Sequence, residues 1–328
     1  YDHAMAEVFF QQFGLQPDFF LDIPATSPNS QMANIMLRLE ELFTTFRPHL
    51  LLVVGDVNST AAAALTANKC GIPIGHIESG LRSFDRTMPE EFNRLITDEL
   101  CNYLFVTEQS GTDHLKAEGK KGEVFFVGNT MIDTLVAFSK QIDASAVLGN
   151  VGVTAGNYLL MTMHRPATVD TKEGLETLLE LITALTKRLP LVFPVHPRTL
   201  SKMRTLGLEE KLKSIPGVHL LEPLGYFDFQ RLVKEARCVV TDSGGIQEES
   251  TFLGVPCFTL RPNTERPVTV TVGTNELMPF DIPRIEKRLD DVMNGTYKKG
   301  TTPIFWDGES TERIFESIQT IFNRHQSV

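Results

Sequence analysis

The sequence contains no run of about 18 apolar residues, which is the length that a membrane-spanning helix needs. It has no basic segment followed by an apolar one that would resemble a signal peptide. The few cysteines form no C-x-x-C pair and have no neighbouring histidine ligand pattern; they are Cys70, Cys101, Cys238 and Cys257. We therefore expect reduced cysteines, no membrane partner and a location in the cytoplasm.

Basic residues are too few for a nucleic-acid-binding surface. The chain has 31 Lys and Arg against 41 Asp and Glu, a formal net charge of −10, and no run of basic residues. Binding to nucleic acid depends on a basic face that displaces counterions. We therefore expect no nucleic-acid partner, and an anionic ligand would have to be held by a few local groups.

Three short motifs of nucleotide and metal sites are also missing. The sequence has no G-K-[ST] of a Walker loop and no G-x-G-x-x-G of a dinucleotide site. It also lacks Asp-x-Asp, which holds a metal and a diphosphate in many nucleotide-sugar enzymes. We expect neither a metal nor another cofactor.

Nine short apolar runs alternate with segments of helical length. They lack internal polar alternation, which is typical of parallel strands buried on both faces. With 328 residues, 42% of them hydrophobic, the chain is long enough for two globular domains. We therefore predict two doubly wound, parallel-sheet α/β domains. The runs are 50–55, 72–77, 103–107, 124–128, 158–163, 191–195, 218–222, 238–242 and 256–260.

The boundary between these domains is expected near residue 150, because 140–157 is Gly-rich and weakly periodic, as a linker is. We predict a first domain over 1–150, a second over 151–309, and a helix over 310–328 that docks on the first. Ser310 is the expected N-cap of that helix. Its apolar face would consist of Ile314, Phe315, Ile318, Ile321 and Phe322.

The amino end predicts a helix over 3–13 that is closed by Gly14. The first predicted sheet therefore begins without an opening strand of its own. We expect one strand–helix–strand unit upstream of Tyr1.

Polar side chains follow most of the predicted strands. Ligands of open parallel sheets bind at the carboxyl ends of the strands, where the loops converge. The sequence therefore predicts a polar site at this edge of each sheet. The residues delivered there include Asp56, His76, Glu78, His164, Arg165, His196, Arg198 and the segment 242–250.

The carboxylates among these residues have structural alternatives. Asp56 and Asp242 would instead cap the helices that follow them. Glu78 and Glu90 would instead form surface ion pairs, worth about 0–1 kcal/mol each. The available partners are Arg82, Arg86 and Arg94.

The segment TDSGGIQEES, residues 241–250, predicts a diphosphate site. A strand ends there, Ser243, Gly244 and Gly245 permit close approach of the backbone, and a helix begins. Unpaired N–H groups and the positive end of the helix dipole would then face an anion. Glu249, one turn into the helix, could accept hydrogen bonds from ribose hydroxyls. The alternative is a plain glycine-rich turn. Further positive charge would come from His164, Arg165 and Arg266.

Six stretches, taken together and in this order, resemble the UDP-N-acetylglucosamine 2-epimerases of bacteria and archaea. They are GDVNST (55–60), HIESGLRSFDRTMPEEFNR (76–94), MTMHRP (161–166), VHPRT (195–199), TDSGGIQEES (241–250) and PNTERP (262–267). The resemblance implies two Rossmann-like domains facing a cleft, which is the glycosyltransferase B-type (GT-B) architecture. It also implies a homodimer.

The resemblance further implies epimerisation of UDP-N-acetylglucosamine at carbon 2 to UDP-N-acetylmannosamine, for surface polysaccharide synthesis. UDP leaves carbon 1 by anti elimination, giving 2-acetamidoglucal, and adds back while the other face of the ring is protonated. Carboxylates with separated pKa values suit this need for acid and base. By motif, Asp56, Glu78 and Glu90 are implied to be catalytic, with His164 assisting departure of the diphosphate.

Ligand contacts are implied by the same motifs. The glycine-rich turn would hold phosphate, Glu249 the ribose, and Arg266 the diphosphate or sugar. Phe229 would lie near the uracil, although a core aromatic is nearly as good an interpretation. His196 and Arg198 would line the sugar side.

Two departures from the family are visible. The family's opening strand and its GTRPE loop, whose Arg contacts the substrate, are not in this chain. Many bacterial members read HRRE where this chain reads HRPA (164–167), in the region of an activating second substrate site. Activation by a second substrate molecule is therefore in doubt.

Other functions remain open from the sequence. They are a hydrolysing epimerase that releases N-acetylmannosamine and UDP, a 2-epimerase of a related UDP-diacetamido uronic acid, a nucleotide-sugar-binding protein without turnover, and a glycosyltransferase. Two-domain folds of this type host more than one chemistry. Three carboxylates at the ends of separate strands argue against a protein that only binds the nucleotide sugar. A glycosyltransferase is disfavoured, because no acceptor site can be identified in the sequence.

Overall fold

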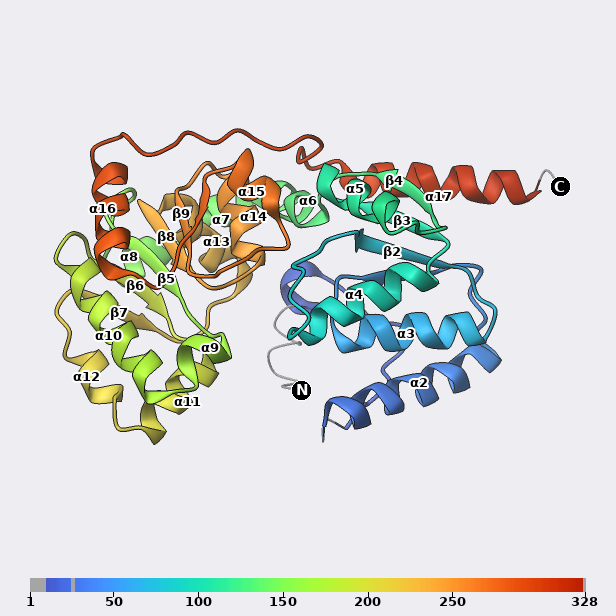
Figure 1. The fold of residues 1–328 in the computed structure, drawn as a ribbon, viewed down its shortest axis with the longest axis horizontal. Coiled ribbons are helices and arrows are strands. Elements are labelled where there is room, and N and C mark those ends of the chain that lie inside the picture. The colour runs from blue at the N-terminus through green and yellow to red at the C-terminus, as the bar shows by residue number, and fades with distance from the viewer. Residues whose placement is uncertain (1–9, 25–26, 327–328) are drawn as a thin grey trace. The chain divides into compact units, whose positions relative to one another are not determined.

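The computed structural model describes residues 10–24 and 27–326, which form two compact units (Figure 1). The first unit contains the chain up to Asp133 and again from Ile304 onward, and the second contains Thr134–Pro303. Helix α6 (Thr130–Ala137) lies where the chain passes from one unit to the other.

The sheet of the first unit has four parallel strands in the order β1-β2-β3-β4. They are β1 (Leu51–Val54), β2 (Ile74–Ser79), β3 (Tyr103–Val106) and β4 (Glu123–Phe126). The helices of this unit are α2 (Pro28–Thr45), α3 (Asn58–Lys69), α4 (Pro89–Leu100), α5 (Gln109–Ala117) and α17 (Ser310–Gln326). The predicted parallel α/β arrangement is confirmed.

This sheet is covered on both faces, which explains its continuous apolar runs. Leu104 and Val106 of β3 pack with Phe43 of α2 on one face. Phe105, between them in the sequence, packs with Ile314 of α17 on the other face. In Figure 1, α3 and α17 accordingly lie on opposite sides of the sheet.

Helix α17 starts at Ser310, so Ser310 is its first residue and the prediction of an N-cap there is wrong. The Asp133 carboxylate accepts hydrogen bonds from the backbone N–H groups of Ser310 at 3.0 Å and Thr311 at 2.5 Å. Ile314 and Ile318 pack against the sheet as predicted. Phe315 is 54% exposed, so its predicted place on the buried apolar face is wrong.

The sheet of the second unit has six parallel strands in the order β10-β9-β8-β5-β6-β7. They are β5 (Leu159–Thr162), β6 (Leu191–Pro194), β7 (Val218–Leu221), β8 (Cys238–Thr241), β9 (Cys257–Thr259) and β10 (Asn275–Leu277). All nine predicted strands are present. Strand β10 was not predicted, because its three residues include Asn275 and Glu276 and so form no apolar run.

Helices cover both faces of this second sheet. The longer ones are α10 (Lys172–Thr186), α11 (Pro197–Thr205), α13 (Tyr226–Glu235), α14 (Gly245–Phe252) and α16 (Ile282–Met293). The shorter ones are α7 (Ser139–Ala144), α8 (Val147–Val151), α9 (Pro166–Val169), α12 (Glu209–Lys213) and α15 (Pro267–Thr271). Side chains of α10, α11 and α16 share one apolar cluster, and those of α8, α13 and α14 share another.

The segment 140–157, predicted as a linker, instead contributes two short helices to the second unit. Val147 of α8 is buried in an apolar cluster of that unit. Its small and glycine residues had suggested a linker, but the apolar residues between them are enough to dock short helices.

Three further predictions concern the N-terminal helix, the cysteines and membrane-spanning segments. Residues 10–13 are helical and Gly14 follows with φ +64°, as predicted, whereas residues 3–9 of that predicted helix lie outside the described residues. The four cysteines are free thiols. Within 10–24 and 27–326, no helix is both long and apolar enough to span a membrane.

Candidate active-site residues

Asp56 and Glu78 lie at the carboxyl ends of neighbouring strands. The end of β1 pairs with β2 at Val54 and Ile77, and the Gly55 N–H donates to the Ile77 carbonyl at 3.0 Å. A Glu78 Oε2 atom lies 3.9 Å from where a Cβ of Gly55 would stand. The two predicted catalytic carboxylates are therefore brought to one edge of the first sheet.

Glu78 has a strained backbone. Its φ is +69°, a conformation that residues with a side chain rarely adopt. The register between β2 and β3 shifts between Ile77 and Ser79, so Glu78 is the extra residue of a bulge. Such strain costs about 1–3 kcal/mol and is concentrated at functional sites.

Asp56 is held by an arginine rather than acting as a helix cap. Helix α3 has its N-cap at Val57, with no side-chain cap bond. The Asp56 Oδ2 atom accepts hydrogen bonds from Arg94 Nε at 3.0 Å and Nη2 at 2.6 Å. The ion-pair alternative considered for the neighbouring glutamates thus applies to Asp56, which remains 27% exposed at its side chain.

Arg94 also contacts Glu91, so it joins Asp56 to the loop before α4. Arg94 Nη1 lies 2.6 Å from Glu91 Oε2. Glu91 in turn accepts hydrogen bonds from the backbone N–H groups of Ser83 and Phe84, both at 2.9 Å. The structural role of Glu91 was not predicted, because its partners lie seven and eight positions away in an irregular loop.

Glu90 lines a pocket of about 530 Å³ in the first unit. Asn58 and Asn93 line it as well. The Asn93 amide donates to the Asp56 carbonyl at 2.9 Å and to the Asn58 side chain at 3.2 Å. Asn93 thereby ties helix α4, which carries Glu90 in its first turn, to the segment that carries Asp56.

In the second unit, Asp242 holds His164. Asp242 accepts hydrogen bonds from the backbone N–H groups of His164 and Arg165, and His164 Nδ1 lies 2.9 Å from its Oδ1 atom. Burial opposes the charged form, but the His164 hydrogen bond and charge together with the backbone donors outweigh it and hold the pKa of Asp242 below its usual range. Asp242 is therefore not a cap; α14 has its N-cap at Gly244.

The glycine-rich turn lies against an arginine cluster. A Cβ at Gly244 would meet Arg266 Nη1 at 3.0 Å and Arg261 Nη1 at 4.0 Å. Arg266 Nε pairs with Glu248 Oε2 at 2.5 Å, and Arg261 with Glu265 at 3.1 Å. The turn thus joins a helix N-terminus to two guanidinium groups, a combination that suits an anion. The predicted Ser243 and Gly245 flank Gly244 in this turn, and Arg261 was not predicted.

Glu249 is buried within α14. Burial raises its pKa to about 7, and a hydrogen bond with Gln230 opposes the rise. Its protonation state therefore changes near neutral pH. Both forms of the carboxyl group can accept hydrogen bonds from hydroxyls, and the charged form is the stronger acceptor.

The remaining predicted residues, which are His196, Arg198 and Phe229, each have different surroundings. The His196 ring lies 5.3 Å from that of His164, and burial followed by the His164 charge lowers its pKa. Arg198 forms an exposed ion pair with Asp170 at 2.5 Å. Phe229 is partly buried and packs against a core cluster of the second unit, as its structural alternative requires.

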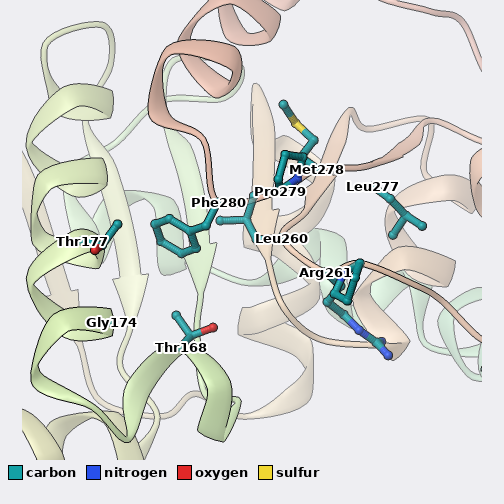
Figure 2. A pocket seen from close by; sticks show the side chains of 10 residues that line it. Thr168, Gly174, Thr177, Leu260, Arg261, Leu277, Met278, Pro279 and Phe280 are labelled. Carbon is teal, nitrogen blue, oxygen red and sulfur yellow. The ribbon is translucent and has the colours of Figure 1, made fainter. Parts of the chain in front are cut away.

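A second pocket, of about 620 Å³, lies in the second unit beside α10 and contains none of the predicted site residues (Figure 2). Figure 2 shows Phe280 between Thr177 and Leu260 along its wall. Arg261, which also approaches Gly244, is its charged lining residue. Across the described part of the chain, no three His, Cys, Asp or Glu residues cluster as metal ligands.

The sequence matches the family model described as UDP-N-acetylglucosamine 2-epimerase over residues 1–319. The chain belongs to this epimerase family. A UDP-N-acetylglucosamine 2-epimerase of Methanocaldococcus jannaschii is 37% identical over 322 residues, covering 96% of this chain and 87% of that protein. A UDP-2,3-diacetamido-2,3-dideoxy-D-glucuronate 2-epimerase of Pseudomonas aeruginosa is 37% identical over 283 residues, covering 85% and 77%.

Solved structures of epimerase family members share the fold. The M. jannaschii UDP-GlcNAc 2-epimerase in complex with UDP-GlcNAc and UDP has a TM-score of 0.87 at 36% identity, covering 96% of this chain and 88% of that one. The Neisseria meningitidis enzyme bound to UDP-GlcNAc has a TM-score of 0.88 at 28% identity, covering 97% and 90%. The predicted GT-B-type fold class and the family resemblance are confirmed.

Proposed function

We propose that this protein interconverts UDP-N-acetylglucosamine and UDP-N-acetylmannosamine without releasing the free sugar. The proposal rests on the paired carboxylates Asp56 and Glu78, which end neighbouring strands in a chain of the epimerase family. It is supported by two relatives whose solved structures contain UDP-GlcNAc.

The second unit would hold the UDP moiety. The N–H groups of Gly244 and Gly245, the Ser243 side chain and the guanidinium of Arg266 would bind the diphosphate, because the Ser243 N–H already donates to Thr241 Oγ1. Glu249 would accept hydrogen bonds from the ribose hydroxyls. His164, oriented by Asp242, would donate a proton or hydrogen bond to the departing diphosphate oxygen. His196 and Arg198 would lie on the sugar side, with Phe229 near the uracil.

The first unit would supply the acid–base chemistry. One carboxylate takes the proton from carbon 2 while the bond between carbon 1 and the diphosphate oxygen breaks, which forms 2-acetamidoglucal and UDP. UDP then adds back to carbon 1 while an acid protonates carbon 2 on the opposite face. Asp56, Glu78 and Glu90 are the groups proposed for these transfers.

The test is proton NMR of the full-length protein with UDP-N-acetylglucosamine in deuterated water. We expect UDP-N-acetylmannosamine carrying deuterium at carbon 2. Free N-acetylmannosamine and UDP would instead indicate the hydrolysing reaction. UDP binding without any conversion would indicate a binding protein.

The uronic acid sugar is a second candidate substrate, because the P. aeruginosa relative named for it has the same 37% identity as the M. jannaschii one, over 283 rather than 322 residues. The same NMR assay with each nucleotide sugar decides between them by relative kcat/KM. The implied homodimer and the cytoplasmic location stay proposals; sedimentation of the full-length protein tests the former and fractionation of the source cells the latter.

A further inference from the structure

A buried ionic network lies beside the strained residue Glu78. His76 of β2 and Asp98 of α4 have fully buried side chains, and His76 Nδ1 lies 2.7 Å from Asp98 Oδ1. The other Asp98 oxygen lies 2.7 Å from Arg82 Nη2. Arg82 also contacts Glu118 at 2.8 Å. None of these four residues is required by the proposed chemistry.

His76 fixes the chain before Asp56. Its Nε2 atom lies 2.9 Å from the Gly55 carbonyl, which can only accept, so Nε2 carries a hydrogen and donates it. Its Nδ1 atom lies 2.7 Å from Asp98 Oδ1, within hydrogen-bonding distance. His76 therefore anchors the end of β1 to α4 through both ring nitrogens.

Asp98 and His114 fix the chain after Glu78. The Gly80 N–H donates to Asp98 Oδ2 at 3.2 Å. The Gly80 carbonyl accepts a hydrogen bond from His114 Nδ1 at 2.9 Å. Gly80 is thus held at both its polar backbone groups, two residues beyond Glu78.

We propose that His76, Asp98 and His114 act as a clamp that positions Glu78 and Asp56 for proton transfer. This inference rests on the proposed function. The anchors lie two residues before and two residues after Glu78, and the same histidine holds the residue that precedes Asp56. A non-glycine residue at φ +69° persists only where its surroundings determine its conformation, and the clamp provides those surroundings.

A purely stabilising role is a weaker explanation of this network. Buried ion pairs are often no more stabilising than apolar side chains of the same volume. What an apolar replacement could not supply is the fixed direction of each hydrogen bond at Gly55 and Gly80. Displacing a reacting group by about 1 Å can cost about 10²-fold in rate.

His76→Asn and His76→Gln separate positioning from stability. The Asn amide nitrogen replaces Nδ1 and retains the Asp98 bond but cannot reach the Gly55 carbonyl. The Gln amide nitrogen replaces Nε2 and can still donate to Gly55. In the full-length protein we expect His76→Asn to lower kcat by about 10²-fold, with UDP affinity within a few-fold of wild type, and His76→Gln to recover most of that loss.

His114→Phe tests the second anchor independently and keeps an aromatic ring against Phe84, which lies 5.1 Å away by ring centroids. We expect a reduced kcat with retained UDP affinity; if His76→Asn does not fold, this variant decides. Asp133→Asn is the matched control, since that carboxylate also holds two backbone N–H groups of the first unit, far in sequence from Glu78. It should lower the melting temperature and leave kcat unchanged.

A folded His76→Asn or His114→Phe with wild-type kcat would overturn the clamp. So would a crystal structure of either variant in which a slowed enzyme keeps Glu78 and Asp56 in place. If the wild type itself converts no nucleotide sugar, the proposed function fails, and the position of Glu78 in the variant structures then tests the clamp alone.

Discussion

The Asp242 carboxylate accepts hydrogen bonds from the backbone N–H groups of His164 and Arg165 and also lies 2.9 Å from the His164 ring nitrogen Nδ1. It therefore fixes both the backbone and the ring of His164. Since Nδ1 faces a carboxylate, Nε2 is the nitrogen left to act on a ligand.

Replacing this carboxylate should impair His164 as a proton donor. For Asp242→Asn we expect turnover to fall by about 10²-fold or more, because one acid–base group contributes about 10²–10⁴. Stability should fall by about 1–3 kcal/mol, since buried donors lose their acceptor. Glu210→Gln, which removes an exposed carboxylate of the same unit, is the control. Normal turnover by a folded Asp242→Asn would exclude this role.

The second prediction concerns the glycine-rich turn. A side chain at Gly244 would run into Arg266, so Gly244→Leu should displace the guanidinium and block the N–H groups of the turn. Wild-type protein should gain about 2.7 kcal/mol of stability at UDP concentrations 100-fold above Kd, and this variant should gain much less. The measurement is the melting temperature with and without UDP.

Gly149→Leu is the control for that experiment, because a Cβ at Gly149 meets nothing within 4 Å. It should keep the full shift produced by UDP. If Gly244→Leu were stabilised by UDP as strongly as wild type, the turn would not be the diphosphate site.

A third prediction follows from Glu249, whose pKa burial raises to about 7. If its carboxylate accepts hydrogen bonds from the ribose hydroxyls of UDP, the affinity for UDP should increase as the pH rises through about 7. The reason is that the charged form is the better hydrogen-bond acceptor. Glu249→Gln should bind UDP more weakly and without this pH dependence. Calorimetric titration between about pH 5.5 and 8.5 is the measurement, and an unchanged slope in the variant would contradict the assignment.

The raised pKa of Glu249 also predicts how the stability of the protein depends on pH. The folded-state pKa of Glu249 is raised from the ordinary value of 4.5, so the folded protein binds the extra proton between about pH 4.5 and 7. The contribution of Glu249 to stability is therefore fully present below about pH 4.5 and is lost as the pH rises through about 7. Between these two limits the wild type should lose about 3 kcal/mol more unfolding free energy than Glu249→Gln. The measurement is urea unfolding of both proteins below about pH 4.5 and above about pH 7.

The strands could be predicted because parallel strands covered on both faces must be apolar throughout. Leu104, Phe105 and Val106 alternate between two cores, so each position of β3 is apolar. β10 could not be predicted this way, because the buried Asn275 bonds to Thr259 and Thr269 rather than packing as an apolar residue. Phe315 was misassigned because five apolar residues form a wider stripe than α17 buries.

Site residues could be predicted where they directly follow a strand. They could not be predicted where their role depends on a contact with a residue far away in the sequence. Asp56, Glu78 and the turn at Ser243–Gly245 all directly follow apolar runs. Arg94, which binds Asp56 across 38 positions, had no local signal for that contact. Asp98 looks like an ordinary acid of a helix, and only the fold brings it to His76.

The last prediction separates catalysis by the carboxylates from structural pairing. Asp56→Asn, Glu78→Gln and Glu90→Gln should each lower turnover by about 10²–10⁴ while UDP still binds. Glu99→Gln, an exposed carboxylate of α4 paired with Lys120, should leave turnover unchanged.

Stability distinguishes Asp56 from Glu78. Asp56→Asn should also destabilise the protein by about 1–3 kcal/mol, because buried Arg94 loses one of its carboxylate partners. Glu78→Gln keeps the backbone strain and should be the most informative variant. If its melting temperature and its turnover both match wild type, Glu78 has no part in proton transfer. If turnover falls while folding and UDP binding persist, release of UDP together with 2-acetamidoglucal, seen by proton NMR, would show that the second proton transfer is the step it serves.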